Sequence, residues 1–517
     1  MKKIFASSFF ILLFWTLFVP IFEFPDEQAH FARISLESDN NKKPFENEAD
    51  LSTEIAKTEK IMGTFRNKKG NNNYTYHPEN KLEFSNNTFG LREQEIIDLN
   101  TEHNKTTFIG REAARYPFLY YSYENIFYNL VKNESILTRV IVSRLGSVLL
   151  GSLLVLVAYR IGEELFGDHH LSTILASLVA LQPMMVFVSS GINPDVMHNL
   201  WFSVIILFAL KFIRYDFVGD VTFYLGLFIG LDMLTKPQAY IAIPVVIFAF
   251  LVRMIVKKQI FQTISYFFIL AFVAFLAGYY VEGNNIIKII RSGNLPYLRS
   301  VENPHPSSPS LIAHAKYSIG RLLNQNTVWY WGVFKWLGVV LPRYFWWIAN
   351  RVVAISFIGT IIGIFRKVNR EKLGQLSILI FSTIFYIFAI FWFDWKTVEA
   401  TTRKVGIQAR YYFPTLVAHM ALLAFGISNL IRKEKIQKTL LISLVLFFVT
   451  LQLGGIYTIA KSYYDTSSII TLFNQASQYK PIFAKSYFWV AWVGLYLAAI
   501  GNLVLMVVKP GDTKELT

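Results

Sequence analysis

The sequence predicts an all-α integral membrane protein, one polytopic bundle over residues 1–517 with about twelve transmembrane helices. Three observations carry this prediction. Hydrophobic residues make up 53% of the 517 residues and charged residues 16%, and the mean hydropathy is +0.38. Apolar runs long enough to cross a bilayer recur along the whole chain. The 46 Phe, 27 Tyr and 11 Trp suit lipid-facing helices and interfacial aromatic belts.

The apolar runs place the spans in chain order. The first, residues 4–22, follows two lysines, and Pro-Asp-Glu rather than a small-residue cleavage site comes after it, so an uncleaved signal anchor is expected. Later spans are expected at 138–166, 171–190, 196–213, two within 218–256 that break at Lys236-Pro237-Gln238, 260–281, 344–365, 376–393, 413–431, 439–459 and 488–508. Two large polar segments interrupt them, 23–115 and 282–343. The first should hold juxtamembrane helices, with an amphipathic helix at 26–37, and a short aromatic helix should follow it from Tyr116.

The distribution of Lys and Arg predicts the orientation. The formal net charge is +15, and the cations gather in short loops between alternate spans, at 211–214, 253–258, 366–372 and 432–438. This positive-inside pattern places both termini in the cytoplasm and the two large polar segments outside. It also argues against nucleic acid as a partner. The chain has no Cys, which excludes disulfides, zinc–thiolate sites and Cys nucleophiles.

The sharpest candidate site follows the first span directly. Asp26 and Glu27 are adjacent there, and His30 comes three residues later. Ionisable groups at the membrane surface are functional candidates because burying them there is costly. A carboxylate beside a low-dielectric surface can act as a general base or bind a metal. The alternatives are a polar stop after a signal anchor and, for His30, a structural role rather than a bond that tunes the carboxylate.

Further candidates are expected at the outer surface. Asp195 ends an Asn-Pro-Asp sequence, which is also turn chemistry; it could orient an acceptor or hold a divalent cation, Mg or Mn, together with Asp26. Lys236 and Arg410, with Tyr411 next to Arg410, run against the positive-inside bias, and a bound phosphate would explain both cations. The alternatives are attraction to lipid headgroups or an ion pair of Lys236 with the Asp one turn earlier in the chain.

The stretch around Asp26 and six further stretches in order resemble the DUF2142 family of bacterial multispanning proteins, which is similar to the GT-C glycosyltransferase superfamily. The first is residues 25–30, and the others are 116–121, 144–147, 182–195, 236–237, 331–342 and 408–414. Each is weak alone, but the ordered set is specific. The chain departs from the family in Ala409, where Gly is usual, and in a longer Asn/Lys-rich loop around 66–105.

The resemblance implies a GT-C-like bundle in a bacterial cell membrane, with outward-facing juxtamembrane helices and loops. It implies a glycosyltransferase that moves a sugar from a polyprenyl-phosphate donor to a cell-envelope glycan or lipid-linked acceptor, by an inverting displacement. On this analogy Asp26 is the base for the acceptor hydroxyl and Glu27 assists it. Lys236 and Arg410 would stabilise the departing prenyl phosphate.

Two other classes of function are compatible with the sequence. One is a polymerase or ligase of lipid-linked polysaccharide, in which outer arginines carry the chemistry. The other is a transporter or flippase of lipid-linked sugars, which predicts inverted repeats and charged residues at mid-membrane. The sequence shows no convincing repeat and, apart from Asp232, few such residues. It also has no phosphate-cradling Gly-rich loop, His-Glu-x-x-His or Gly-x-Ser-x-Gly motif, so ATP hydrolysis, zinc proteolysis and α/β-hydrolase chemistry are not indicated.

Overall fold

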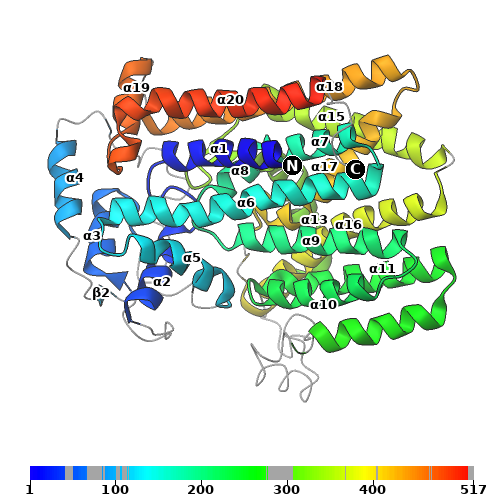
Figure 1. Cartoon of the computed structure of the whole chain (residues 1–517). Coiled ribbons are helices and arrows are strands. Elements are labelled where there is room, and N and C mark those ends of the chain that lie inside the picture. Colours follow the sequence, from blue (N-terminus) through cyan, green and yellow to red (C-terminus); the bar gives the residue numbers. More distant parts are fainter. Residues whose placement is uncertain are drawn as a thin grey trace.

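The computed structural model is a bundle of long helices with shorter helices gathered at one end (Figure 1). The long or apolar helices are α1 (Lys2–Phe18), α6 (Ile136–Phe166), α7 (His169–Ala180), α8 (Pro183–Ser189), α9 (Asp195–Arg214), α10 (Gly219–Met233), α11 (Ala242–Lys257), α15 (Arg343–Phe365), α16 (Arg370–Thr401), α17 (Leu416–Asn429), α18 (Glu434–Ile459) and α20 (Trp489–Val508). The structure describes residues 1–40, 51–66, 84, 88–99, 105–107, 113, 116–274, 276, 307–366, 368–402, 404, 406–464, 466 and 468–509.

Short elements surround the bundle. The short α-helices are α2 (Glu27–Asn40), α3 (Thr53–Ile61), α4 (Phe89–Asp98), α5 (Leu119–Leu130), α13 (Leu311–Arg321), α14 (Thr327–Trp329) and α19 (Ile469–Ala476). The 3-10 and π turns are η3 (Pro237–Ile241), η4 (Leu322–Asn326), η5 (Ala409–Thr415), η6 (Ala460–Tyr464), η7 (Ile482–Ala484) and η8 (Ser486–Phe488). The structure also has two antiparallel strand pairs, β1 (Leu51–Ser52) with β2 (Lys105–Thr107) and β3 (Val333–Phe334) with β4 (Val339–Val340).

The all-α membrane bundle predicted from the sequence is confirmed. Eight of the described helices are long and apolar enough to cross a membrane, or nine if α7 and α8 form one bent span. The first predicted span corresponds to α1, which has 17 residues. The predicted span at 260–281 is described as a helix over Ile260–Ala274, and residues 275 and 277–281 lie outside the described residues. The number twelve stays a prediction.

The predicted span at 171–190 is bent. It consists of α7 and α8, which meet at an angle of 64°. Pro183 has no N–H to donate to the preceding turn, so the first helix ends before it. The Gln182 side chain then accepts a hydrogen bond from the Met185 N–H and begins the second helix. The bend brings the loop after α8 against α1, where Ser190 Oγ donates to the Leu12 carbonyl.

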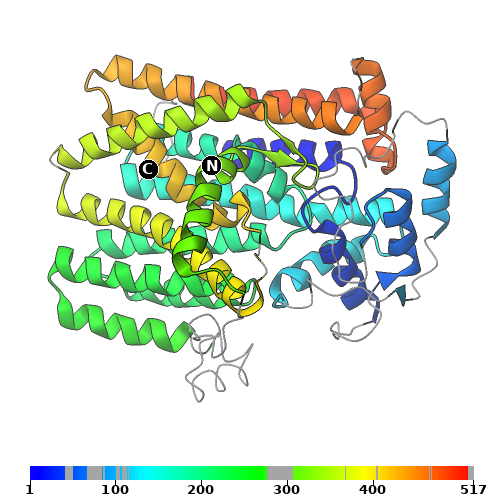
Figure 2. The same cartoon turned by 180° about the vertical axis from the view of Figure 1, so that it is seen from behind.

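The two short helices that bear on the site are present where the sequence places them. The predicted amphipathic helix at 26–37 is α2, and the aromatic helix expected from Tyr116 is α5. α2 packs against α5, and α5 packs against α6. Both lie at the same end of the bundle (left in Figure 1, right in Figure 2). The Asn/Lys-rich loop around 66–105 falls largely outside the described residues.

Small residues let α15 and α17 pack closely. A side chain added at Gly426 would overlap the Ser356 carbonyl, and one at Gly359 would overlap the Gly426 carbonyl. Ser356 Oγ also donates to the Leu423 carbonyl at 3.0 Å. Close approach of backbones through small residues is a common basis of helix association in membranes.

Replacing Gly426 with Leu should therefore force α15 and α17 apart and lower the free energy of unfolding by about 1–3 kcal/mol. Thermal unfolding of the purified protein in detergent measures the effect. Gly501→Leu on α20 is the control, because a side chain there meets nothing within 4 Å. An equal loss in both variants would show that the added volume, rather than the helix contact, is responsible.

Candidate functional site

The loop between α1 and α2 holds Asp26 in an unusual backbone conformation. Asp26 has φ 58° and Phe22 has φ 63°, both in the left-handed region that residues other than Gly rarely adopt. Such a conformation costs about 1 kcal/mol or more per residue and persists only where the surrounding contacts enforce it. These contacts come mainly from the next residue, Glu27.

Glu27 and Arg144 form a buried ion pair that anchors this loop to α6. Arg144 Nε donates to Glu27 Oε1 at 2.7 Å and its NH2 donates to Oε2 at 2.8 Å, while Oε2 also accepts from the Phe22 N–H at 2.8 Å. The same guanidinium donates to the carbonyls of Thr16, Val19 and Pro20 at the end of α1. Neither side chain is exposed to solvent. The sequence places Glu27 beside Asp26, but the fold turns it inward.

Asp26 instead faces a cluster of charges from three distant parts of the chain. Arg410 NH2 donates to Asp26 Oδ2 at 2.6 Å, and Arg410 NH1 lies 3.9 Å from Asp195 Oδ2. Lys236 Nζ donates to Asp195 Oδ1. We call these four residues the Asp26 cluster. Its members are mostly buried, but the Asp26 side chain is 29% exposed and is the member most open to an incoming molecule.

Turn chemistry brings Asp195 to the cluster. Asn193 Oδ1 accepts a hydrogen bond from the Asp195 N–H at 2.8 Å, and Asn193 Nδ2 donates to the Pro25 carbonyl at 3.1 Å. Gly191 lies so close to Phe24 that any side chain there would overlap the ring. The Asn-Pro-Asp turn therefore begins α9 and also fixes the loop that carries Asp26.

Two tyrosine rings flank the cations. The Lys236 Nζ lies 5.9 Å from the Tyr116 ring centroid and 5.8 Å from that of Tyr411, and the Arg410 guanidinium lies 5.5 Å from the Tyr411 ring. Cations over aromatic faces are stabilised without losing their charge. Burial raises the pKa of Tyr116 well above its ordinary value, so its hydroxyl stays protonated at neutral pH.

The sequence did not identify a hydrogen-bonded chain beneath the cluster. His198 Nδ1 lies 2.6 Å from Asp232 Oδ1, and His198 Nε2 lies 3.0 Å from the Tyr386 hydroxyl. Asp232 thus bonds to His198, while Lys236 forms its ion pair with Asp195. The helical spacing of His198 three residues after Asp195 was the available signal. All three chain residues are buried in the bundle.

A small cavity joins this chain to the cluster. Its volume is about 10 Å³, close to the space that one water molecule requires. The lining residues come from α9, α16, η3, η5 and the turn before η3: Asp195, His198, Asn199, Lys236, Gln238, Tyr386, Ile390, Arg410, Tyr411 and Pro414. Asn199 Nδ2 has no hydrogen-bond partner within the described residues. The cavity therefore offers polar atoms to a small polar group next to Arg410.

The family model described as "Predicted membrane protein (DUF2142)" matches residues 9–419. The chain belongs to the DUF2142 family. The match includes all four residues of the Asp26 cluster and the hydrogen-bonded chain beneath it. No curated protein matches this DUF2142 protein by sequence.

Two of the solved structures similar to this DUF2142 protein are of ArnT from Cupriavidus metallidurans. In the apo state ArnT is 12% identical with a TM-score of 0.44, and bound to undecaprenyl phosphate it is 13% identical with the same score. Both matches cover 99% of this chain and 80% of ArnT. The archaeal oligosaccharyltransferase AglB from Archaeoglobus fulgidus, in complex with an inhibitory peptide and a dolichol-phosphate, is 13% identical with a TM-score of 0.41, over 89% of this chain and 56% of AglB.

The stretches that resemble the family meet around Asp26 in this DUF2142 protein. The stretches at 25–30, 182–195, 236–237 and 408–414 supply the Asp26 cluster, and the stretch at 144–147 supplies the partner of Glu27. The stretch at 331–342 forms the β3–β4 hairpin, from which the Trp336 indole N–H donates to the Phe22 carbonyl at 3.4 Å. Segments far apart in sequence thus share one location.

A divalent cation shared by Asp26 and Asp195 would compete with Arg410. The guanidinium contacts both carboxylates and lies between them. Within the described residues, no group of three or more His, Asp or Glu side chains is arranged to hold a metal ion. The two carboxylates of this DUF2142 protein are thus arranged for a cation of the protein itself.

His30 lies beside the cluster but bonds elsewhere. Its Nδ1 lies 2.9 Å from the Tyr121 hydroxyl, and its ring packs 5.6 Å from the Tyr116 ring. Burial lowers the pKa of His30 to about 4, against 6.5 for an unperturbed His. The imidazole is therefore neutral at pH 7, and it contributes packing and one hydrogen bond to the wall of the site.

This pKa makes the DUF2142 protein less stable in mild acid. Below pH 6.5 the unfolded chain binds a proton that buried His30 does not, so stability should fall between pH 6.5 and 4 by about 3 kcal/mol. His30→Gln should remove that part of the pH dependence, as measured by thermal unfolding across this range. His169→Gln, at an exposed position, is the control for the substitution itself. An unaltered pH profile in His30→Gln would contradict the assignment.

Proposed function

We propose that this protein is a membrane glycosyltransferase that moves a sugar from a polyprenyl-phosphate donor to a cell-envelope glycan or lipid-linked acceptor. The reaction takes place at the outer face of a bacterial cell membrane, with both termini of the chain in the cytoplasm. The Asp26 cluster carries the proposal. It sets the solvent-accessible carboxylate of Asp26 against Arg410, and it holds Lys236 close by in an ion pair with Asp195. Cations beside a carboxylate suit a transfer with a phosphate leaving group.

The proposed chemistry is a single displacement. The acceptor hydroxyl oxygen forms a bond to the anomeric carbon while Asp26 takes the hydroxyl proton, and the bond from that carbon to the phosphate oxygen breaks. The departing prenyl phosphate gains negative charge, which Arg410 and Lys236 stabilise. One displacement inverts the configuration at the anomeric carbon. Every proton and electron pair is accounted for without a further reactant.

The ion pair between Arg410 and Asp26 gives the donor a way to activate the base. Arg410 NH2 contacts Asp26 at 2.6 Å, whereas Arg410 Nε and NH1 have no hydrogen-bond partner among the described residues. A donor phosphate that accepts hydrogen bonds from these N–H groups competes for the guanidinium and releases the carboxylate. The acceptor then meets a free carboxylate only when the donor is in place.

Glu27 has a positioning role in this proposal. Its oxygens are held by Arg144 and the Phe22 N–H, so it fixes the loop on which Asp26 sits. His30 and Tyr411 contribute to the wall of the site and to the environment of the cations. Asp195 keeps Lys236 and Arg410 oriented through its two oxygens. The donor phosphate then meets two prepositioned cations.

The proposal is tested by transfer of a labelled sugar from polyprenyl-phosphate donors to envelope acceptors in membranes that contain the protein. Arg410→Gln should lower this transfer by about 10²–10³-fold, because it removes the main charge facing the leaving group. Arg351→Gln is the control: Arg351 also stacks on a ring, 5.0 Å from Trp347, but lies on α15. Transfer from a nucleotide sugar without any lipid phosphate would contradict the proposal. Movement of intact lipid-linked sugar between leaflets, without transfer, would indicate a transporter.

A further inference from the structure

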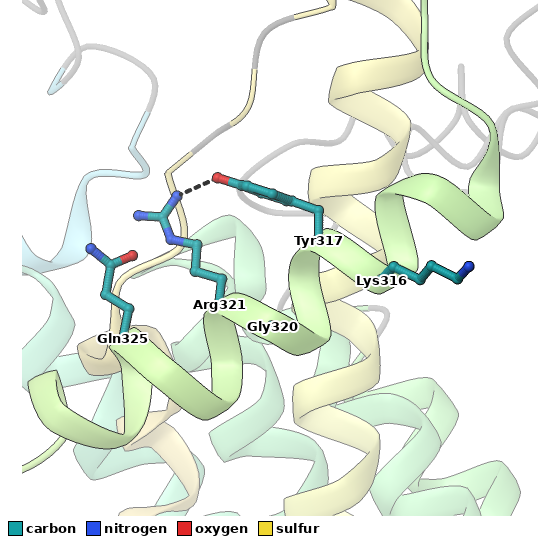
Figure 3. A pocket seen from close by; sticks show the side chains of 5 residues that line it. All are labelled: Lys316, Tyr317, Gly320, Arg321 and Gln325. Carbon is teal, nitrogen blue, oxygen red and sulfur yellow. Dashed lines mark hydrogen bonds between the residues drawn. The ribbon is translucent and has the colours of Figure 1, made fainter.

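A second cationic surface lies on α13, away from the Asp26 cluster. This helix crosses α16 rather than running along it (Figure 3). A pocket of about 590 Å³ opens on it, lined by Lys316, Tyr317, Gly320, Arg321 and Gln325. Tyr317, Arg321 and Gln325 project from the same side of the helical segment, whereas Lys316 points away from them (Figure 3). We call this set of residues the α13 pocket.

The cations in the α13 pocket, and Lys404 beside it, can accommodate further hydrogen bonds. Arg321 NH1 donates to the Tyr317 hydroxyl at 3.2 Å, but Arg321 Nε has no partner among the described residues. Lys404 Nζ lies 3.4 Å from the Tyr317 ring centroid, although Lys404 is more than 80 residues away in sequence. Within the described chain, none of Lys316, Arg321 and Lys404 forms an ion pair with a carboxylate. The surface is therefore suited to an anionic group.

Exposed apolar side chains lie on the side of this helix that faces away from Tyr317 and Arg321. Ile312 is 70% exposed, Ile319 is 56% exposed and Leu323, in the following turn, is 63% exposed. A short helix that exposes large apolar side chains next to Lys and Arg is typical of a helix at a membrane interface. The expected ligand is thus both anionic and attached to a hydrocarbon chain.

Hydrogen bonds connect α13 and its continuation to the elements that surround Arg410. α13 continues into the π-turn η4, a rare geometry that is frequent at functional sites. Within that turn, Asn326 Nδ2 donates to the Tyr412 hydroxyl at 3.4 Å, and Tyr412 lies in η5 two residues after Arg410. At the other end, His314 Nε2 lies 3.2 Å from Asp394 Oδ2 on α16. The helix is therefore fixed to the elements that position Arg410.

We propose that the α13 pocket binds the phosphate of the polyprenyl-phosphate lipid before and after transfer. This inference rests on the proposed glycosyl transfer. Arg321 presents a planar guanidinium with free N–H groups, which suits the two-point recognition of a phosphate, and Lys404 adds a second charge. The prenyl chain reaches the apolar side of the same helix, where Ile312, Ile319 and Leu323 are exposed. The donor is thereby held within reach of η5 without occupying the Asp26 cluster.

The test measures binding rather than turnover. Purified protein in nanodiscs of phosphatidylcholine is labelled with a photoreactive polyprenyl phosphate, and the labelled peptides are identified by mass spectrometry. Saturable labelling of α13 and η4 is expected, and the double variant Arg321→Gln with Lys404→Gln should bind about tenfold more weakly, the equivalent of about 1.4 kcal/mol. Arg351→Gln should bind like the wild type.

Several results would overturn the inference. Unchanged labelling in the double variant, or an equal loss in Arg351→Gln, would show that α13 does not recognise the phosphate. Displacement of the probe by phosphatidylglycerol at the same concentration would show a site for bilayer headgroups instead. The proposed function can fail independently of this inference. If wild-type protein binds the lipid at α13 but transfers no sugar, the lipid site stands and the glycosyltransferase assignment is wrong.

Discussion

Replacing Asp26 with Asn is expected to lower sugar transfer by about 10³-fold, the middle of the usual range for loss of a general base. The amide cannot take the proton of the acceptor hydroxyl, and it leaves Arg410 without the counterion that it contacts at 2.6 Å. Since the Asp26 side chain is 29% exposed, the substitution creates no large cavity and should leave the fold intact. Transfer per folded protein, with the amount of folded protein measured by size-exclusion chromatography, gives the result.

Matched variants separate the role of Asp26 from its charge. Asp98→Asn removes a carboxylate from α4, where Asp98 accepts a hydrogen bond from Gln94, and should leave transfer unchanged. Asp26→Glu keeps the charge but moves the oxygens, so it should retain a small part of the activity. Near-normal transfer by Asp26→Asn would remove the base assignment. Activity that survives Asp26→Asn but is lost in Arg410→Gln would favour a polymerase or ligase in which arginine carries the chemistry.

The sequence predicted the bundle and the members of the Asp26 cluster because these leave local signals. Long apolar runs mark helices in a bilayer whatever their neighbours are. Asp26, Asp195, Lys236 and Arg410 stood out as charges beside apolar runs, where a charge needs a reason. The break between α7 and α8 also has a local signal, the Gln182-Pro183 pair. The apolar run continues through this pair, so its length alone predicted a span without a bend.

The partners of these residues could not be predicted. The contact of Asp26 with Arg410 spans 384 positions, and that of Glu27 with Arg144 spans 117. Nothing in the local sequence distinguishes a carboxylate that faces solvent from an adjacent one that faces the bundle. The left-handed backbone at Asp26 turns the pair apart, and a non-Gly residue with positive φ carries no clear sequence signal. The chain from His198 to Asp232 and Tyr386 depends likewise on three helices packing together.

Asp26 is partly exposed to solvent, whereas the adjacent Glu27 is fully buried. Replacing Glu27 should therefore have a large effect on stability. Glu27→Gln should destabilise the protein by about 3–5 kcal/mol, the usual cost of leaving a buried charge without its partner. Arg144 would lose the two carboxylate contacts at 2.7 and 2.8 Å, and the Phe22 N–H would lose an anionic acceptor. Thermal unfolding in detergent measures the loss. Glu163→Gln is the control, since its 2.7 Å pair with Arg160 is exposed and should be worth less than about 1 kcal/mol.

The double variant Glu27→Gln with Arg144→Met decides whether Glu27 stabilises the loop or takes part in the reaction. Removing both charges relieves the unpaired guanidinium, so part of the stability should return. The recovery should be incomplete, because Arg144 also donates to the carbonyls of Thr16, Val19 and Pro20 at the end of α1. If Glu27 only positions Asp26, transfer per folded molecule should fall much less in Glu27→Gln than in Asp26→Asn. A Glu27→Gln protein that unfolds like the wild type but transfers no sugar would instead make Glu27 a direct participant, and the loop would then need another anchor.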